Sequence, residues 1–189
     1  MFGAAGLSWL TANSDHVQAL EGAEASQPQA QSIKTLPGGL RYTDFMEGSG
    51  PAPEWGNMLR IQYTTYVIEN GKDLKVIDSS KNRNDYLFRH GNGFQIQGME
   101  EAVHTMKLGG YRRVIIPPHM SYVSSDLGPL PDSAGTRRNM NRAINDVSTG
   151  GLLVMDIQLL KIESVPDPKR YYTDITDPVE IRKRLSQKN

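Results

Sequence analysis

The pair Asn70-Gly71, set between two strand-like segments, constrains the fold of this chain more than any other feature. Asn-Gly is a strong signal for a two-residue hairpin, because a type I′ turn requires positive φ at both central residues. Before the pair, largely apolar residues alternate with polar ones. The polar residues are Arg60, Gln62 and Thr64, and the opposite face carries Leu59, Ile61, Tyr63, Thr65 and Val67. This alternation is typical of a half-buried strand. The sequence therefore predicts a hairpin that joins residues 59–67 to a partner strand at residues 74–78.

A helix is predicted over residues 99–108. Its apolar residues recur at i, i+3, i+4 and i+7 and form one stripe: Met99, Ala102, Val103 and Met106. Glu100 and Glu101 stand in the first turn, where acidic side chains suit the helix dipole. Gly109-Gly110 then supplies residues that accept positive φ, so we expect the helix to end there.

Further strands are predicted around this helix, at residues 40–45, 111–116 and 152–162. The last one is apolar on nearly both faces, so it should lie centrally in the sheet. No strand–helix–strand repeat is present. The pattern predicts an α+β fold, in which an antiparallel β-sheet wraps around one short α-helix.

Composition excludes several kinds of site. Lys plus Arg number 21 and Asp plus Glu also 21, which argues against a general nucleic-acid binder because phosphate neutralisation needs surplus cations. The chain has no cysteine, so disulfides and thiolate sites are excluded. The four histidines, at positions 16, 90, 104 and 119, lack metal-ligand spacing; we expect no metal and no cofactor, and we place His90 and His119 in surface loops.

The chain divides into three parts: an acidic and apolar N-terminal extension at residues 1–36, a globular domain at residues 37–165 and a C-terminal tail at residues 166–189. The apolar start is too short to span a bilayer. It is either the remainder of a processed targeting peptide or a short helix that docks on a partner or on the domain. Within the domain, a long loop precedes the last strand, and its middle is predicted to form a short helix over residues 137–144.

These residues together resemble the FKBP-type peptidyl-prolyl cis-trans isomerase family. The matching segments, which agree in order and spacing, are Tyr63, Asp78-Ser79-Ser80, Arg83, Phe88, Gly91, residues 96–101, residues 106–110, residues 115–118, Tyr122 and residues 155–160. The long loop is similar to that of plant and algal plastid members, many of which reside in the thylakoid lumen. The resemblance therefore implies that localisation, although the chain lacks the cysteines that some lumenal members carry.

The resemblance also implies a site. Its catalytic residues would be Tyr63, Asp78, Phe88, Ile96 and Tyr122, and its further substrate-binding residues Ile77, Arg83, Tyr86, Gln95, Met99 and Met155. The Tyr63 hydroxyl would hold the Asp78 carboxylate, with Arg83 as a second partner. The Ile96 backbone N–H and the Tyr122 hydroxyl would hold substrate carbonyls. No cofactor is implied.

Three positions depart from the family pattern. Ile77 and Met155 stand where phenylalanine is usual, and Met99 stands where the most active members have tryptophan. Flexible aliphatic side chains thus replace flat aromatic walls, so the resemblance implies a foldase of weak activity on proline-containing client proteins. The alternative is a non-catalytic scaffold or assembly subunit of a membrane protein complex such as a photosystem, bound through residues 1–35, 123–151 and 166–189.

Overall fold

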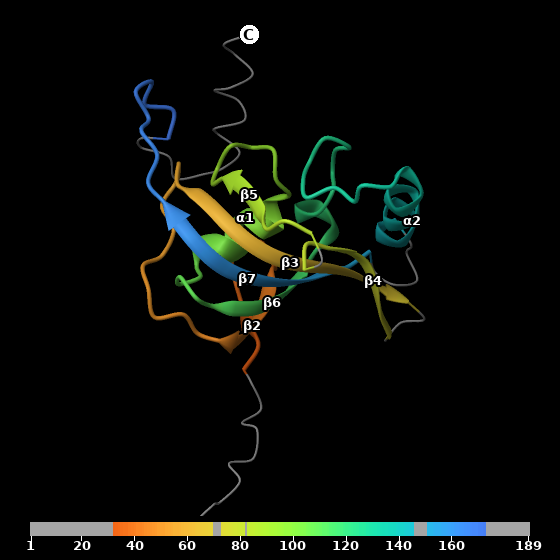
Figure 1. Cartoon of the computed structure of the whole chain (residues 1–189). Helices are drawn as coiled ribbons and strands as arrows, with labels where there is room; N and C mark the ends of the chain where they lie inside the picture. Colours follow the sequence, from red (N-terminus) through yellow and green to blue (C-terminus); the bar gives the residue numbers. More distant parts are fainter. Residues whose placement is uncertain (1–31, 70–72, 82, 146–150, 173–189) are drawn as a thin grey trace, which may run out of the picture. The chain divides into compact units, whose positions relative to one another are not determined.

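The structure, a computed structural model, describes residues 32–69, 73–81, 83–145 and 151–172 (Figure 1). Its strands are β1 (Lys34–Thr35), β2 (Arg41–Met46), β3 (Met58–Glu69), β4 (Asp73–Ser79), β5 (Tyr86–Arg89), β6 (Tyr111–Ile116) and β7 (Leu153–Glu163). Its helices are α1 (Gln97–His104) and α2 (Ala134–Ile144), and a 3-10 turn spans Pro118–Met120. Among these residues no helix is both long and apolar enough to cross a membrane.

The described strands form one antiparallel sheet in the order β1-β2-β6-β7-β3-β4. Strand β5 pairs with the first residues of β3, on the side where β4 pairs with the later ones. The predicted α+β fold is confirmed, and so is the central place of the last strand, because β7 lies between β6 and β3. Strands β3 and β4 form the predicted hairpin, with Val67 opposite Lys75. Its Asn70-Gly71 turn lies outside the described residues. The domain limits at residues 37 and 165 stay a prediction. Strand β1 lies just before the first of these limits.

Alternation along the strands builds the core. Leu59, Ile61 and Tyr63 of β3 are buried, while Val114 and Ile116 of β6 face the same interior. The predicted apolar stripe is also buried: Met99, Ala102 and Val103 lie in α1, and Met106 follows it. Figure 1 shows the sheet curving past α1, with α2 at the end where β4 lies. Helix and sheet pack closely because Gly98 has no side chain: a Cβ there would run into the side chain of Ile116.

The predicted end of the helix is wrong. Helix α1 ends at His104, and the following Thr105 has φ of −98°. Gly109 does have a positive φ of 88°, but it serves a later turn, where its N–H donates to Leu159 O at 2.9 Å. One of the last helical carbonyls is bound by a side chain from outside the helix, since Arg112 Nη1 donates to Ala102 O at 2.9 Å. A side chain of β6 therefore does the work expected of a glycine cap.

The long loop before β7 contains the predicted helix, now extended to α2 over Ala134–Ile144. Ser133 precedes it and caps it, because its Oγ accepts the N–H of Thr136 at 3.1 Å. Met140 and Ile144 are buried, as the sequence pattern indicated. Upstream of α2 the Gly128-Pro129 peptide bond is cis. Strands β1 and β5 were not predicted, because they are two and four residues long and too short for a periodic pattern.

Candidate active site

The centre of the candidate site is the Asp78 carboxylate. Tyr63 Oη donates to Asp78 Oδ2 at 2.6 Å, and Arg83 Nη2 donates to Asp78 Oδ1 at 2.6 Å. Both predicted contacts are confirmed. The hairpin creates the contact with Tyr63, because the β3–β4 register sets Thr65 opposite Asp78. Burial raises the pKa of Tyr63 far above its usual value, and the bond to Asp78 raises it further. The hydroxyl is therefore a permanent donor that holds one carboxylate oxygen.

Aromatic side chains continue from this centre. The Tyr63 and Tyr86 rings meet edge to face with centroids 5.6 Å apart, and Tyr86 lies 5.8 Å from Phe88. Tyr86 Oη donates to Gln95 Oε1 at 2.8 Å. Burial also raises the pKa of Tyr86, so this hydroxyl keeps its proton. The structure thus brings together four side chains that the resemblance assigned to one site, from β3, β5 and the segment before α1.

The apolar side chains predicted for the site belong to the core of the protein. Phe88, Ile96, Met99 and Met155 are 4%, 0%, 0% and 0% exposed, and Ile77 packs partly buried against them. They come from β4, β5, β7 and the start of α1. Two of the three residues that depart from the family pattern, Met99 and Met155, are therefore fully enclosed. Whatever they contribute to binding, they also support the fold.

The two donors predicted to hold substrate carbonyls are already occupied by carbonyls of the chain itself. Ile96 N donates to Gly128 O at 2.9 Å, and Tyr122 Oη donates to Pro129 O at 2.5 Å. Gly128 N in turn donates to Phe94 O at 2.7 Å, which completes a short parallel bridge. Burial raises the pKa of Tyr122 well above its usual value. A loop segment thus sits at the predicted substrate positions.

A second buried polar cluster lies farther along α1, and one sequence expectation fails there. His90 was placed in a surface loop, but its exposed fraction is 0%. His90 Nδ1 is hydrogen-bonded to Glu100 Oε2, and His90 Nε2 lies 3.0 Å from His104 Nδ1. The Trp55 ring stacks on both imidazoles, with centroids 4.1 and 4.2 Å away. Burial lowers the pKa of His104, and neighbouring His90 lowers it further. We call Trp55, His90, Glu100 and His104 the histidine cluster.

The signal for this cluster was present in the sequence. Glu100 and His104 stand four residues apart, which places them on one face of a helix. Their partner His90 could not be assigned, because it follows a four-residue strand with no periodic pattern. His119, by contrast, is exposed as predicted. Within the described ranges, no three His, Asp or Glu side chains are grouped to hold a metal ion.

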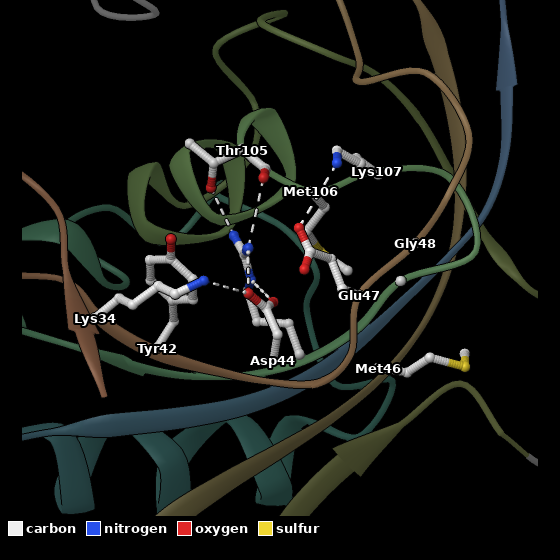
Figure 2. A pocket seen from close by; sticks show the side chains of 11 residues that line it. Lys34, Tyr42, Asp44, Met46, Glu47, Gly48, Thr105, Met106 and Lys107 are labelled. Atoms are coloured by element: carbon white, nitrogen blue, oxygen red, sulfur yellow. Dashed lines mark hydrogen bonds and ion pairs between the residues drawn. The ribbon is translucent and has the colours of Figure 1, made fainter. Parts of the chain in front are cut away.

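Figure 2 shows a separate hollow between β1, β2 and the end of α1. Its charged groups are bound to one another. Asp44 accepts two bonds from Arg112, at 2.6 and 3.1 Å, and lies 3.5 Å from Lys34. Lys107 pairs with Glu47 at 3.6 Å. These pairs tie the edge of the sheet to the end of the helix, which is a structural role.

Comparison with known proteins decides the family. The sequence profile described as FKBP-type peptidyl-prolyl cis-trans isomerase matches residues 50–149. The chain belongs to this family. The matched range contains ten of the eleven predicted site residues, all except Met155 of β7. The assignment made from the residue pattern alone is thus confirmed at the level of family.

Relatives of this FKBP-type chain include two Arabidopsis thaliana proteins. It is 31% identical over 144 residues to "Peptidyl-prolyl cis-trans isomerase FKBP16-1, chloroplastic", covering 74% of this chain and 65% of the relative. It is 33% identical over 152 residues to "Peptidyl-prolyl cis-trans isomerase FKBP17-1, chloroplastic", covering 71% and 66%. The chain thus spans just under two thirds of the length of these relatives. The crystal structure of FkpA from Escherichia coli, 24% identical, matches with a TM-score of 0.53 over 73% of this chain and 55% of that one, and shares the fold.

Proposed function

We propose that this protein catalyses the cis–trans isomerisation of peptide bonds that precede proline in client proteins. The observation that carries the proposal is the Asp78 carboxylate held by Tyr63 and Arg83 beside a wall of buried apolar side chains. Membership of the FKBP-type family supports the same reaction. Because the chain spans only part of its relatives, the activity is inferred here from its own residues.

The reaction forms and breaks no covalent bond, so the site has only to bind the twisted amide better than the planar one. The barrier of about 18–20 kcal/mol comes from amide resonance. Twisting removes the resonance and makes the carbonyl less polar, so a dry apolar environment favours the transition state over the ground state. Phe88, Ile96 and Met99 supply that environment, while Ile96 N–H and the Tyr122 hydroxyl would orient the neighbouring client carbonyls.

We expect the activity to be weak. Ile77, Met99 and Met155 stand where flat aromatic side chains are usual, and the two methionines have more rotatable bonds than an aromatic residue. A less rigid wall discriminates less between the planar and the twisted amide, because its contacts adjust to both. The prediction is a measurable but modest acceleration of an uncatalysed reaction that takes about 10–100 s at 25 °C.

The decisive experiment is a protease-free isomerisation assay on a proline tetrapeptide, with the wild type beside Asp78→Ala and Tyr122→Phe. We expect acceleration by the wild type and a loss of at least about fivefold in kcat/KM in each variant, the effect of a lost hydrogen bond to a charged or buried group. Tyr111→Phe is the matched control, since its hydroxyl lies 3.4 Å from Asp156, in the part of the sheet outside the candidate site. A wild-type rate equal to the uncatalysed rate contradicts the proposal.

The partners and the compartment follow from the relatives. We infer proline-containing proteins as clients and a plastid location, since two relatives are named chloroplastic. The finer assignment to the thylakoid lumen rests on the long loop. Fractionation of plastids from cells that express the protein, probed with an antibody against residues 83–145, tests it: signal in the lumen supports the assignment and signal in the stroma contradicts it.

A role as a docked subunit of a membrane complex is less well supported. Of the three segments predicted to dock, residues 1–31 and 173–189 lie outside the described residues. Residues 127–131 of the third segment bind this chain's own site. We therefore favour catalysis, and docking stays a prediction. Detergent-solubilised membranes test it: co-purification of the full chain, lost when residues 166–189 are removed, would support a docked subunit.

A further inference from the structure

The segment of residues 127–131, which we call the strap, binds the candidate site as a ligand would. Its consecutive carbonyls Gly128 O and Pro129 O accept from Ile96 N and Tyr122 Oη, at 2.9 and 2.5 Å. Of these two residues only Gly128 has an N–H, and it donates to Phe94 O at 2.7 Å. Both donors that would hold a client's carbonyls are therefore taken by two adjacent residues of the same polypeptide.

Side chains hold the strap in place at both ends. Leu127 is 3% exposed and belongs to the core cluster that includes Phe88, Ile96 and Met99. Beyond the strap, Asp132 accepts a hydrogen bond from Arg83 Nη1, while Arg83 Nη2 binds Asp78. Helix α2 follows directly and buries Met140. The strap is thus anchored by its own apolar residue, by a helix and by an arginine that also binds the central carboxylate.

We propose that the strap is an internal ligand that closes the site and must leave Ile96 and Tyr122 before a client can bind. The inference rests on the proposed function in one respect, the use of these two donors by clients. A ligand tethered by a short segment competes at an effective concentration in the millimolar range. The apparent Kd for a client then equals the intrinsic Kd divided by the fraction of molecules whose strap is open. Weak basal activity follows from closure as well as from the aliphatic walls.

One substitution in the strap should displace it from Ile96 and Tyr122 without replacing a residue of the candidate site. A Cβ on Gly128 would overlap Tyr86 Oη and lie 2.9 Å from Gln95 Oε1. These two atoms are hydrogen-bonded to each other, so displacing either one alone breaks that bond. Gly128→Ala should therefore favour the open strap. Gly135→Ala is the matched control, because a Cβ there meets only Ser133 Oγ, at an ordinary 3.5 Å.

The direct readout is hydrogen exchange of the Ile96 amide, followed by NMR on the full chain. Its only acceptor among the hydrogen bonds described is Gly128 O, so its protection reports the open fraction of the strap. We expect Gly128→Ala to lower this protection by about tenfold or more, and Gly135→Ala to leave it no lower than in the wild type. Equal protection in wild type and folded Gly128→Ala overturns the proposal.

The peptide assay then separates this proposal from the proposed function. If both hold, kcat/KM of Gly128→Ala exceeds that of the wild type by the same factor by which Ile96 protection falls. If Ile96 protection falls but neither protein accelerates isomerisation, the strap is supported and the catalytic function fails. If the wild type is active and Gly128→Ala gains nothing despite lost protection, the strap does not compete with clients and the proposal is wrong.

If circular dichroism shows that Gly128→Ala does not fold, a second variant provides the test. Asp132→Asn removes the charge that Arg83 binds beyond the strap, and its side chain is 77% exposed, so the fold should tolerate it. We expect the same two changes in the same direction, of about two- to fivefold, the range of an exposed ion pair. Unchanged Ile96 protection and unchanged kcat/KM in folded Asp132→Asn would count against the strap as an anchored ligand.

Discussion

Helix α1 contributes to two buried polar clusters that differ in where their partners come from. In the histidine cluster, Glu100 and His104 belong to the helix, and His90 directly follows β5. In the candidate site, Ile96 N and Tyr122 Oη instead bind carbonyls of the strap, which belongs to neither helix nor strand. Both arrangements satisfy buried donors. Only the second satisfies them with groups that can move away without dismantling an element.

This difference separates a structural cluster from a binding site. An unpaired buried polar group costs about 1–3 kcal/mol, so every such group needs a partner in each populated state. The histidine cluster has its partners fixed by the fold, so we expect its loss to affect stability. In the proposed mechanism the candidate site exchanges strap carbonyls for client carbonyls, so we expect changes there to affect activity. The following substitutions test that division.

The largest effect should come from Glu100→Ala. Glu100 is 1% exposed, binds His90 and accepts the N–H of Gly91 at 3.0 and 3.1 Å. Removal of the carboxylate leaves the His90 imidazole and the Gly91 N–H buried without this partner, which should lower the free energy of unfolding by about 3–5 kcal/mol. Urea unfolding measures this. The control is Glu101→Ala, whose carboxylate accepts from Gln97 Nε2 at 2.8 Å in a less buried place and should cost about 1 kcal/mol or less. Equal losses would contradict a structural role peculiar to Glu100.

A smaller effect is expected from Gly98→Ala, which presses α1 away from the sheet. The added Cβ meets the side chain of Ile116, and overpacking of this kind costs about 1–3 kcal/mol. Because α1 contributes to both clusters, we expect stability and kcat/KM to fall together. Gly135→Ala in α2 should instead be neutral or stabilising by up to about 1 kcal/mol. If Gly98→Ala lowers neither quantity, the close approach of α1 and β6 does not limit either cluster.

Tyr63→Phe sharpens the comparison from the side of the candidate site. It removes the hydroxyl from Asp78 but leaves the bond from Arg83, so the free energy of unfolding should fall by only about 0.5–1.5 kcal/mol. We expect kcat/KM to fall by about threefold or more. Tyr66→Phe is the control on the same strand: its hydroxyl donates to Asp156 at 3.0 Å, so it should cost similar stability and no activity. Matching activities in the two variants would remove Asp78 from the proposed mechanism.

The smallest effect concerns pH. His104 has a lowered pKa in the folded protein because it is buried beside His90, so the unfolded chain binds the extra proton more readily. Its contribution to stability is complete above the unfolded value of about 6.5 and is lost as pH falls below it. Urea unfolding at pH 7.5 and 5.5 measures this. We expect His104→Gln to flatten the dependence in this window, and an unchanged slope would show that His104 does not titrate with unfolding.

Several features of the fold could be predicted because their causes are local. Alternation from Leu59 to Val67 predicted β3, and the Asn-Gly pair predicted its hairpin with β4. The hairpin register then brings Tyr63 and Asp78 together, so this contact was within reach of sequence reasoning. The end of α1 was not, because its carbonyl Ala102 O is bound by Arg112, a residue of β6 whose position the helix sequence does not encode.

Sequence by itself determined the longer elements, the buried face of β3 and of α1, and which family's site residues are present, since periodicity and motif spacing carry that information along the chain. Beyond the contacts of Asp78, only the tertiary structure decided what those residues touch. The burial of His90 against Glu100, and the seating of the strap on Ile96 and Tyr122, each join groups from separate parts of the chain. A backbone donor and a loop carbonyl look the same in every sequence, and their pairing exists only once packing brings them within hydrogen-bonding distance.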